Sequence, residues 1–355
     1  MNCLISDAPA WRAIDTLFDG VCDDAEILIL TSSLTASDLA ATVLTHPAVR
    51  GCKVTVISDR SRGVDPAVDL LDPSIYHQSW ISCRARDGRE LSFEGNVIVI
   101  HSDGDVRAAV GSSPLVDGRW SSDRDVWGPL HSRCEISPVA LHDLGELLQA
   151  LSGTVELRDN APEFLLDPAG RFALYTAATE IANTDGVNTH ARVLTNLFTP
   201  IDEQLHGNVP LPVSDLAIYT PNYGPELHGV DLLIAALKPT GNITVYTNQR
   251  PGRAVVERVR VDGMVRGVYI DGPIRKRSDA PSATVVQWRD GEDTWTLTGL
   301  SGIDDISIAH SVADDGAGLQ IALLSQVDTP LLPWPESEDH SHVRILQTPV
   351  LGHAG

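Results

Sequence analysis

Two stretches of the chain share one pattern, and this pattern decides the fold. The first is Glu94-Gly95-Asn96-Val97-Ile98-Val99-Ile100-His101, followed by Ala109-Val110-Gly111-Ser112-Ser113-Pro114-Leu115. The second is Ser282-Ala283-Thr284-Val285-Val286-Gln287-Trp288, followed by Trp295-Thr296-Leu297-Thr298-Gly299-Leu300-Ser301-Gly302. The first residue and the later glycine are 17 positions apart in both copies. Each copy predicts a strand, a loop and a second strand, and the shared spacing predicts a duplicated fold.

The length of the chain agrees with a duplication. Its 355 residues fit two domains of roughly 150 to 180 residues. Two turn signals, Asp159-Asn160-Ala161-Pro162 and Asp167-Pro168-Ala169-Gly170, place the boundary between them. We therefore expect a first repeat at 1–155, a connecting segment at 156–180, a second repeat at 181–328 and an acidic, proline-containing tail at 329–355. The tail is expected to be extended or partly disordered.

The two halves predict the same order of elements. The first half predicts helices at 11–18, 37–45 and 139–151, and strands at 26–30, 53–57, 79–84, 97–100, 107–110 and 135–137. The second half predicts helices at 191–204 and 230–237, and strands at 216–220, 242–246, 267–270, 319–324 and within the second motif. A strand, a helix and a strand in succession imply parallel pairing, so we expect two mixed, largely parallel sheets flanked by helices.

Composition limits the possible partners and compartments. The formal net charge is −22, which disfavours broad binding of DNA or RNA because phosphate backbones are repelled. The five cysteines are odd in number and lack the spacing of a zinc site, so we expect free thiols in a reducing cytosol. No apolar stretch is long enough to span a membrane, and the first residues do not resemble a secretory signal. A soluble cytoplasmic protein without a metal or another cofactor is expected.

With these two motifs, residues 10 to 325 resemble the phospholipase D superfamily. In that family two α/β repeats pack around one pseudo-two-fold active site. Each repeat supplies an H-x-K-x4-D strand, a G-S-x-N turn and an N-x-E strand. One histidine attacks phosphorus and the other protonates the leaving group, while lysines and asparagines stabilise the phosphoryl oxygens. The resemblance implies the same two-repeat fold here.

The first repeat departs from the family pattern at its reactive positions. Glu94 lies where the family has histidine, and Asn96 lies where it has lysine. The turn keeps Ser112 but has Pro114 in place of asparagine, and Glu135 matches the glutamate of the N-x-E strand.

The second repeat departs in the same way. Ser282 replaces the histidine, Thr284 the lysine and Gln320 the glutamate, while Gly299 of the turn is kept. Without either imidazole or either lysine, the site lacks its proton shuttle and the fixed positive charge that a phosphodiester requires. We therefore expect the family's catalytic centre to be absent.

Two alternatives remain open at this stage. One is an active phosphodiesterase or nuclease whose site is relocated or completed by a partner, with His101 or His310 facing the cleft between the repeats. The other is a nucleic-acid binder without chemistry that uses Arg275, Lys276 and Arg277, the densest basic run.

The leading hypothesis is a catalytically inactive scaffold or recognition subunit of a bacterial complex. The resemblance implies a helicase, ATPase or nuclease as its protein partner, in DNA processing or antiphage defence. An acidic surface whose cations are almost all arginine suits docking to a basic protein, since arginine forms bidentate contacts.

Overall fold

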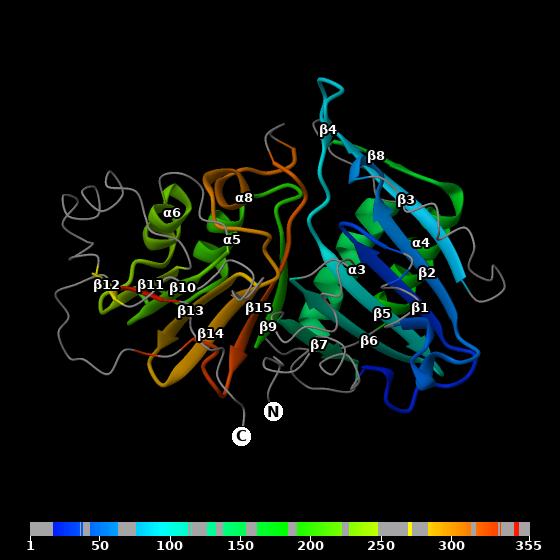
Figure 1. Cartoon of the computed structure of the whole chain (residues 1–355), viewed down its shortest axis with the longest axis horizontal. Helices are drawn as coiled ribbons and strands as arrows, with labels where there is room; N and C mark the ends of the chain where they lie inside the picture. The colour runs from blue at the N-terminus through cyan, green and yellow to red at the C-terminus, as the bar shows by residue number, and fades with distance from the viewer. Residues whose placement is uncertain are drawn as a thin grey trace.

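The computed structural model contains two sheets that the chain builds one after the other (Figure 1). It describes residues 17–35, 37, 43–62, 76–112, 115, 126–132, 138–153, 162–183, 190–221, 227–247, 269–271, 283–313, 317–332, 334 and 344–347. The predicted helices at 11–18 and 37–45 and the predicted strand at 135–137 lie wholly or mostly outside these residues.

The first sheet has the strand order β4-β3-β2-β1-β5-β6-β7, and β8 also pairs with β3. Its strands are β1 (Glu26–Thr31), β2 (Lys53–Asp59), β3 (Tyr76–Arg84), β4 (Glu90–Leu91), β5 (Asn96–Ser102), β6 (Asp105–Gly111), β7 (Trp127–His131) and β8 (Glu163–Leu166). Strands β1, β2 and β3 are parallel, and the hairpin of the first motif, β5 and β6, joins them antiparallel through β1.

The second sheet has the order β12-β16-β11-β10-β13-β14-β15-β9. Its strands are β9 (Ala191–Thr195), β10 (Leu216–Tyr219), β11 (Ile243–Thr247), β12 (Tyr269–Asp271), β13 (Val285–Asp290), β14 (Asp293–Thr298), β15 (Ile321–Val327) and β16 (Arg344–Gln347). The series β11-β10-β13-β14-β15 repeats the series β2-β1-β5-β6-β7. The expected duplication of two mixed sheets is confirmed, with parallel pairs limited to one side of each sheet instead of forming most of it.

One predicted element is wrong, and the structure has further elements in the tail and in the connecting segment. The predicted helix at 191–204 is wrong: it begins with β9, which pairs with β15, and the helix α5 (Ile201–Asn208) starts only after Pro200. The predicted tail contributes β16, which lies between β11 and β12. The connecting segment contains β8 and most of the helix α4 (Pro168–Ala182). The helix starts there because the side chain of Asp167 accepts the N–H of Gly170 and Pro168 occupies the first turn.

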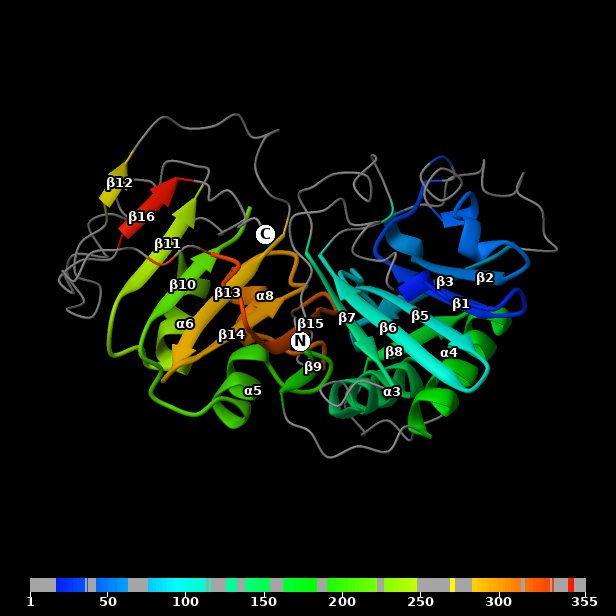
Figure 2. The same ribbon diagram turned by 90° about the horizontal axis from the view of Figure 1, so that it is seen from below.

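Helices cover both sheets (Figure 2). The remaining α-helices with described bounds are α3 (Pro138–Ser152), α6 (His228–Leu237) and α8 (Asp305–Ala309), and the short 3-10 helices are η2 (Pro47–Val49) and η3 (Arg60–Arg62). Helices α3 and α4 pack on one face of the first sheet, and the same buried core includes residues of the second sheet such as Val193, Ile321 and Leu323. Helices α5, α6 and α8 cover the other face of the second sheet. One hydrophobic core therefore joins the halves.

A clamp of charged groups supplements this core. Asp143 of α3 accepts hydrogen bonds from Arg192 of β9, at 2.7 Å from Nε and 3.0 Å from the second terminal nitrogen. The backbone N–H of Val193 donates to the same carboxylate at 3.1 Å. Asp143 raises the pKa of Arg192 further, chiefly through its hydrogen bond. A bidentate contact of this kind fixes direction as well as distance, so the clamp sets how α3 lies against the edge of the second sheet.

Removing Asp143 should destabilise the whole chain. Asp143→Ala removes two hydrogen bonds of the partly buried Arg192, whose bond to Asn208 remains, and the side-chain acceptor of the Val193 N–H, so the free energy of unfolding should fall by about 2 to 4 kcal/mol. Urea denaturation measures this fall. Glu146→Ala on the same helix is the matched control, because its exposed pair with His142 should contribute at most about 0.5 kcal/mol. Equal stability of the two variants would contradict the role of the clamp.

Candidate functional site

The two halves meet at a short backbone bridge, which we call the junction. Phe93 pairs in parallel with Leu319. The N–H of Glu94 donates to the carbonyl of Leu319, and the N–H of Leu319 donates to the carbonyl of Ser92, both at 2.8 Å. Added Cβ atoms would overlap Ile321 at Gly95 and Ser92 at Gly318, so glycine allows the strands to approach this closely. The first motif therefore begins at the contact between the halves.

The buried carboxylate of Asp59 fixes the first half of the junction. Asp59 ends β2, and its Oδ2 accepts the N–H of Phe93 at 2.8 Å. Its Oδ1 accepts the N–H of Ser61, a residue of η3, at 2.8 Å. A carboxylate with both oxygens occupied is held in one position. Its role here is to hold the backbone.

The lysine position of the first motif holds a buried amide. Asn96 is 2% exposed, and its Oδ1 lies 2.9 Å from the hydroxyl of Thr31, at the end of β1. The N–H of Ser32 donates to the same oxygen at 3.3 Å. The Thr31 hydroxyl also accepts the N–H of Leu115 at 3.2 Å. The amide thus ties β1 to β5.

The lysine position of the second motif is closed in the same way. The hydroxyls of Thr284 and Thr220 lie 2.8 Å apart, and both residues are 0% exposed. Thr220 follows β10, as Thr31 ends β1, so the two pairs occupy corresponding places in the two sheets. At both positions a short, neutral side chain is bonded to the neighbouring strand end, and neither position supplies a cation.

Glu94, at the histidine position, faces an arginine. Its carboxylate forms an ion pair with Arg62 of η3, and both side chains keep part of their surface in water. A carboxylate neutralised in this way is a poor nucleophile toward phosphorus and repels a phosphodiester less than a free one would.

The remaining described motif residues hold backbone. The N–H of Val126 donates to the hydroxyl of Ser112 at 3.2 Å. Gln320 accepts from the N–H and the hydroxyl of Ser301, each at 3.2 Å. The N–H of Gln320 donates to buried Asn196, whose amide nitrogen donates to the carbonyls of His310 and Gly318. These bonds stabilise the turns that the motif glycines begin.

The two candidate histidines lie in different halves. His101 lines a cavity between β1, β2, β3 and α4, and burial lowers its pKa, which favours the neutral imidazole. His310 is an exposed residue directly after α8. The described contacts do not connect either side chain with the junction. Glu135, Ser282 and the basic run Arg275, Lys276 and Arg277 lie outside the described residues.

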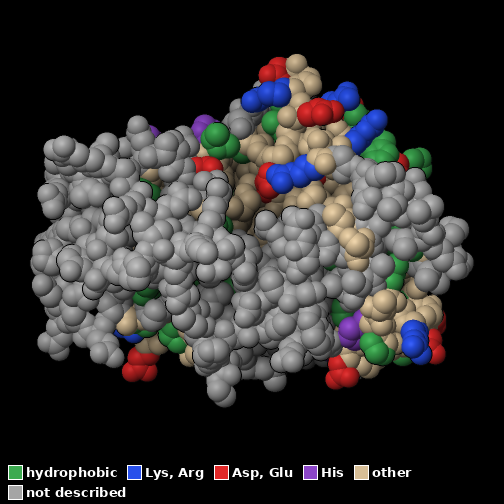
Figure 3. All heavy atoms as spheres, viewed as in Figure 1, with side chains coloured by type: hydrophobic (Ala, Val, Ile, Leu, Met, Phe, Trp, Pro, Cys, Tyr) green, Lys and Arg blue, Asp and Glu red, His purple; other side chains and the backbone are tan. Residues whose placement is uncertain are grey.

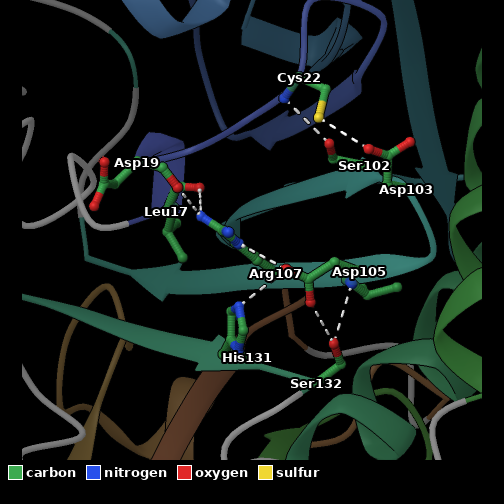
Figure 4. Close-up of polar contacts among 10 residues, drawn as sticks. Leu17, Asp19, Cys22, Ser102, Asp103, Asp105, Arg107, His131 and Ser132 are labelled. Atoms are coloured by element: carbon green, nitrogen blue, oxygen red, sulfur yellow. Dashed lines mark hydrogen bonds and ion pairs between the residues drawn. The ribbon is translucent and has the colours of Figure 1, made fainter.

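A second polar cluster, not expected from the sequence, surrounds the tip of the β5–β6 hairpin (Figure 4). Asp105 contacts Arg107 and His131, each at 3.2 Å, and accepts the hydroxyl of Ser132 at 2.7 Å. Arg107 also donates to the backbone carbonyls of Leu17 and Asp19. Asp105 is 5% exposed and both of its oxygens are occupied, so it orients Arg107, which ties Leu17 and Asp19 to the hairpin.

The first sheet also carries an arginine edge, defined as Arg60, Arg62, Arg84, Arg86 and Arg89. It lies around the ends of β2 and β3 and the turn before β4, where Lys and Arg side chains gather in Figure 3. The guanidinium of Arg60 stacks 4.6 Å from the ring centre of Trp80, and the Nε of Arg84 is buried without a hydrogen-bond partner. These residues form no dense basic run in the sequence, because they are spread over 30 positions.

The described residues also include three cysteines. Cys22, Cys52 and Cys83 are free thiols, as expected, and burial raises the pKa of Cys83 to about 12. Among the described residues, no group of three or more His, Cys, Asp or Glu side chains could hold a metal ion. Within the same part of the chain, no helix has the length and apolar character that crossing a membrane requires.

Comparison with known proteins gives a match in structure alone. No protein-family model and no curated protein sequence matches the chain. A crystal structure of a mutant of yeast tyrosyl-DNA phosphodiesterase is similar at a TM-score of 0.53 and 10% identity, covering 97% of this chain and 95% of that one. A second structure of the yeast enzyme matches at a TM-score of 0.50 and 10% identity, covering 93% and 92%. The chain therefore has the two-repeat α/β fold of phospholipase D-like proteins.

Proposed function

We propose that this chain is a phospholipase D-like protein that does not cleave phosphodiesters and serves as a recognition or scaffold subunit. The observation that carries the proposal is the closure of both lysine positions, where Asn96 bonds to Thr31 and Thr284 bonds to Thr220. Phosphoryl transfer of this family's type needs cations at the oxygens that gain charge. In place of these cations the chain has two buried neutral pairs, whose hydrogen bonds stabilise the fold.

The bonds at the junction support the scaffold part of the proposal. The side chains of Asp59, Asn96 and Gln320 each accept a backbone N–H, so residues at or near the family's reactive positions hold the backbone beside the junction. We propose a protein partner, and the resemblance suggests a helicase, an ATPase or a nuclease of a bacterial DNA-processing or antiphage complex. Arginines on an otherwise acidic chain can form bidentate contacts with carboxylates of that partner.

The purified chain should not hydrolyse phosphodiesters. The assay uses bis(p-nitrophenyl) phosphate, labelled DNA and RNA, and phosphatidylcholine vesicles, each with and without Mg²⁺, with yeast tyrosyl-DNA phosphodiesterase as the positive control on a suitable DNA substrate. Turnover that His101→Ala or His310→Ala abolishes would overturn the proposal in favour of a relocated site. The scaffold role has a separate test, since the chain isolated from its native cells should elute in a defined complex and not alone.

Restoring a lysine should cost stability. Asn96→Lys or Thr284→Lys buries an ammonium where the native side chain forms a neutral hydrogen bond to a threonine, so the free energy of unfolding should fall by about 3 kcal/mol or more. Ser61→Lys adds the same side chain at an exposed position of η3 and should change stability by no more than about 0.5 kcal/mol. Folded, equally stable lysine variants would show an open site and contradict the closure.

A second candidate function is binding of a nucleic-acid backbone without chemistry, and the arginine edge favours it. Arg60 on Trp80 combines a cation with an aromatic face, a combination that single-stranded nucleic acids recognise through phosphate and base. The position of the edge beside the junction would place a bound strand along the contact between the halves.

Binding of this kind should depend steeply on salt. With up to five phosphate contacts to single-stranded DNA, log K should fall with log salt at a slope of about −3.5. Replacing Arg60 and Arg89 by alanine should reduce the slope by about 1.4. Arg289→Ala is the matched control, because Arg289 also stacks on a tryptophan, Trp334, but belongs to the second half. Fluorescence anisotropy with a labelled oligonucleotide measures both, and absence of binding at about 50 mM salt would eliminate this candidate.

A further inference from the structure

Two surfaces of different character flank the junction. The arginine edge borders it through Arg62, which pairs with Glu94 where the first motif begins. On the other half, Asn196 donates to the carbonyls of Gly318 and His310, so the segment that follows α8 borders the junction as well. Figure 1 shows α5 and α8 on one side of this contact and the turn between β3 and β4 on the other. A molecule bound across the junction would touch both surfaces.

The arginine edge carries local positive charge on an acidic chain. Positions 60–62 and 84–94 hold five arginines against the three carboxylates of Asp87, Glu90 and Glu94, whereas the whole chain has 48 acidic and 26 basic residues. Arg60 and Arg89 are exposed there. At a salt concentration of about 0.15 M, charges more than roughly 8 Å apart are largely screened. A ligand at the edge therefore responds to the arginines more than to the net charge of the chain.

Arg60 is oriented for a contact with a carboxylate. Its guanidinium stacks 4.6 Å from the ring centre of Trp80. Stacking occupies the face of a guanidinium and leaves its rim of N–H groups for hydrogen bonds. A side chain that is already held in place loses less conformational entropy on binding, so Arg60 can bind a carboxylate at a lower entropic cost than a mobile arginine.

The surface on the second half is apolar, and we call it the apolar patch, defined as Phe198 and Ile306. Their side chains are 40% and 49% exposed. The N–H of Ala313 donates to the carbonyl of Leu197 at 3.2 Å, which places Phe198 beside the chain that follows α8, and Ile306 lies on α8 itself. Large apolar side chains at one surface site are typical of contacts with another protein.

Carboxylates beside the apolar patch favour a protein over a nucleic acid strand. Asp304 caps α8 two positions before Ile306, and Asp202 of α5 lies close enough to His310 for their charges to interact. A nucleic-acid backbone carries the same charge along its whole length, so a strand that crossed the junction would leave the arginines and meet these carboxylates. A protein segment can instead be acidic at one end and apolar at the other.

We propose that the arginine edge and the apolar patch together form a docking surface for one acidic segment of a protein partner. The carboxylates of the segment bind the arginines, and its large apolar side chains pack on Phe198 and Ile306. Arginine suits this role because its planar fork can form two parallel hydrogen bonds with one carboxylate. The inference rests on the recognition role proposed above and adds to it the chemistry of the partner and the place where the partner binds.

The probe is a fluorescein-labelled peptide with four glutamates at one end and Leu, Phe and Leu at the other, made in both directions. Fluorescence anisotropy at about 150 mM salt should give a Kd of about 100 µM or lower for one of the two peptides. Replacing its glutamates by lysine should weaken binding at least about fivefold, and so should replacing its apolar residues by serine.

Variants of the protein test the two surfaces separately. Arg60→Ala together with Arg89→Ala should weaken binding of the peptide about tenfold, because two contacts with carboxylates are lost. Phe198→Ser together with Ile306→Ser should also weaken it about tenfold, because the apolar end of the peptide then remains in water. All four positions are exposed, so both double variants should stay folded, which thermal melts verify.

Two exposed residues away from these surfaces provide the controls. Arg289 stacks on a tryptophan as Arg60 does, and Phe172 on α4 is 72% exposed. Arg289→Ala and Phe172→Ser should each change the Kd of the peptide by less than about twofold.

Three outcomes would overturn the proposal. The first is absence of saturable binding of either peptide up to about 1 mM. The second is unchanged binding in both folded double variants, which would place the peptide elsewhere. The third is tighter binding of an oligothymidylate of similar length, lost in the arginine variant but kept in the apolar one, which would assign the edge to nucleic acid.

These outcomes are separate from those that test the scaffold role. A chain that elutes in a complex from its native cells but does not bind the peptides would lose this surface and keep the role. Turnover of phosphodiesters would overturn the role, whatever the peptides do.

Discussion

The arrangement of the two halves depends on the pairing of Phe93 with Leu319. This pairing is short, and a buried polar side chain of each half supports it. In the first half Asp59 accepts the N–H of Phe93. In the second half Asn196 accepts the N–H of Gln320 and donates to the carbonyl of Gly318. A buried backbone group without a partner costs free energy, so these side chains favour one register of the bridge over its neighbours. The Asp143–Arg192 clamp then fixes the angle from a second point.

The need to satisfy buried polar groups also explains which residues occupy the motif positions. In an enzyme of this fold, charge in the cleft is costly for stability and is retained because the reaction needs it. Here Asn96 and Thr284 exchange that charge for hydrogen bonds to Thr31 and Thr220. The Glu94–Arg62 pair is the remaining charged contact at the described motif positions. The junction thus has the properties of a structural interface, which is why we favour recognition over catalysis.

Local patterns predicted the elements that are continuous in sequence. Apolar runs identified β1, β2, β10 and both motif hairpins, because each strand is buried over most of its length. The helix predicted over β9 was wrong because Ala191–Thr195 forms its strand by pairing with β15, which is more than 100 residues away in the sequence. The start of α4 looked like a turn, since Asp-Pro begins both turns and helices. The cavity and the arginine edge were not predictable, because strand register and hairpin geometry bring their residues together.

The position of β16 has a consequence for biosynthesis. The first sheet uses strands that end at Leu166, and α4 covers it by Ala182, so this half can fold while the rest of the chain is still being made. The second sheet places Arg344–Gln347 between β11 and β12, so β12 has no neighbour on its inner side until residue 347 has left the ribosome. During synthesis β11 therefore lacks its partner β16 for about 100 residues of translation, and this edge of the second sheet lies on the side away from the first half (Figure 2).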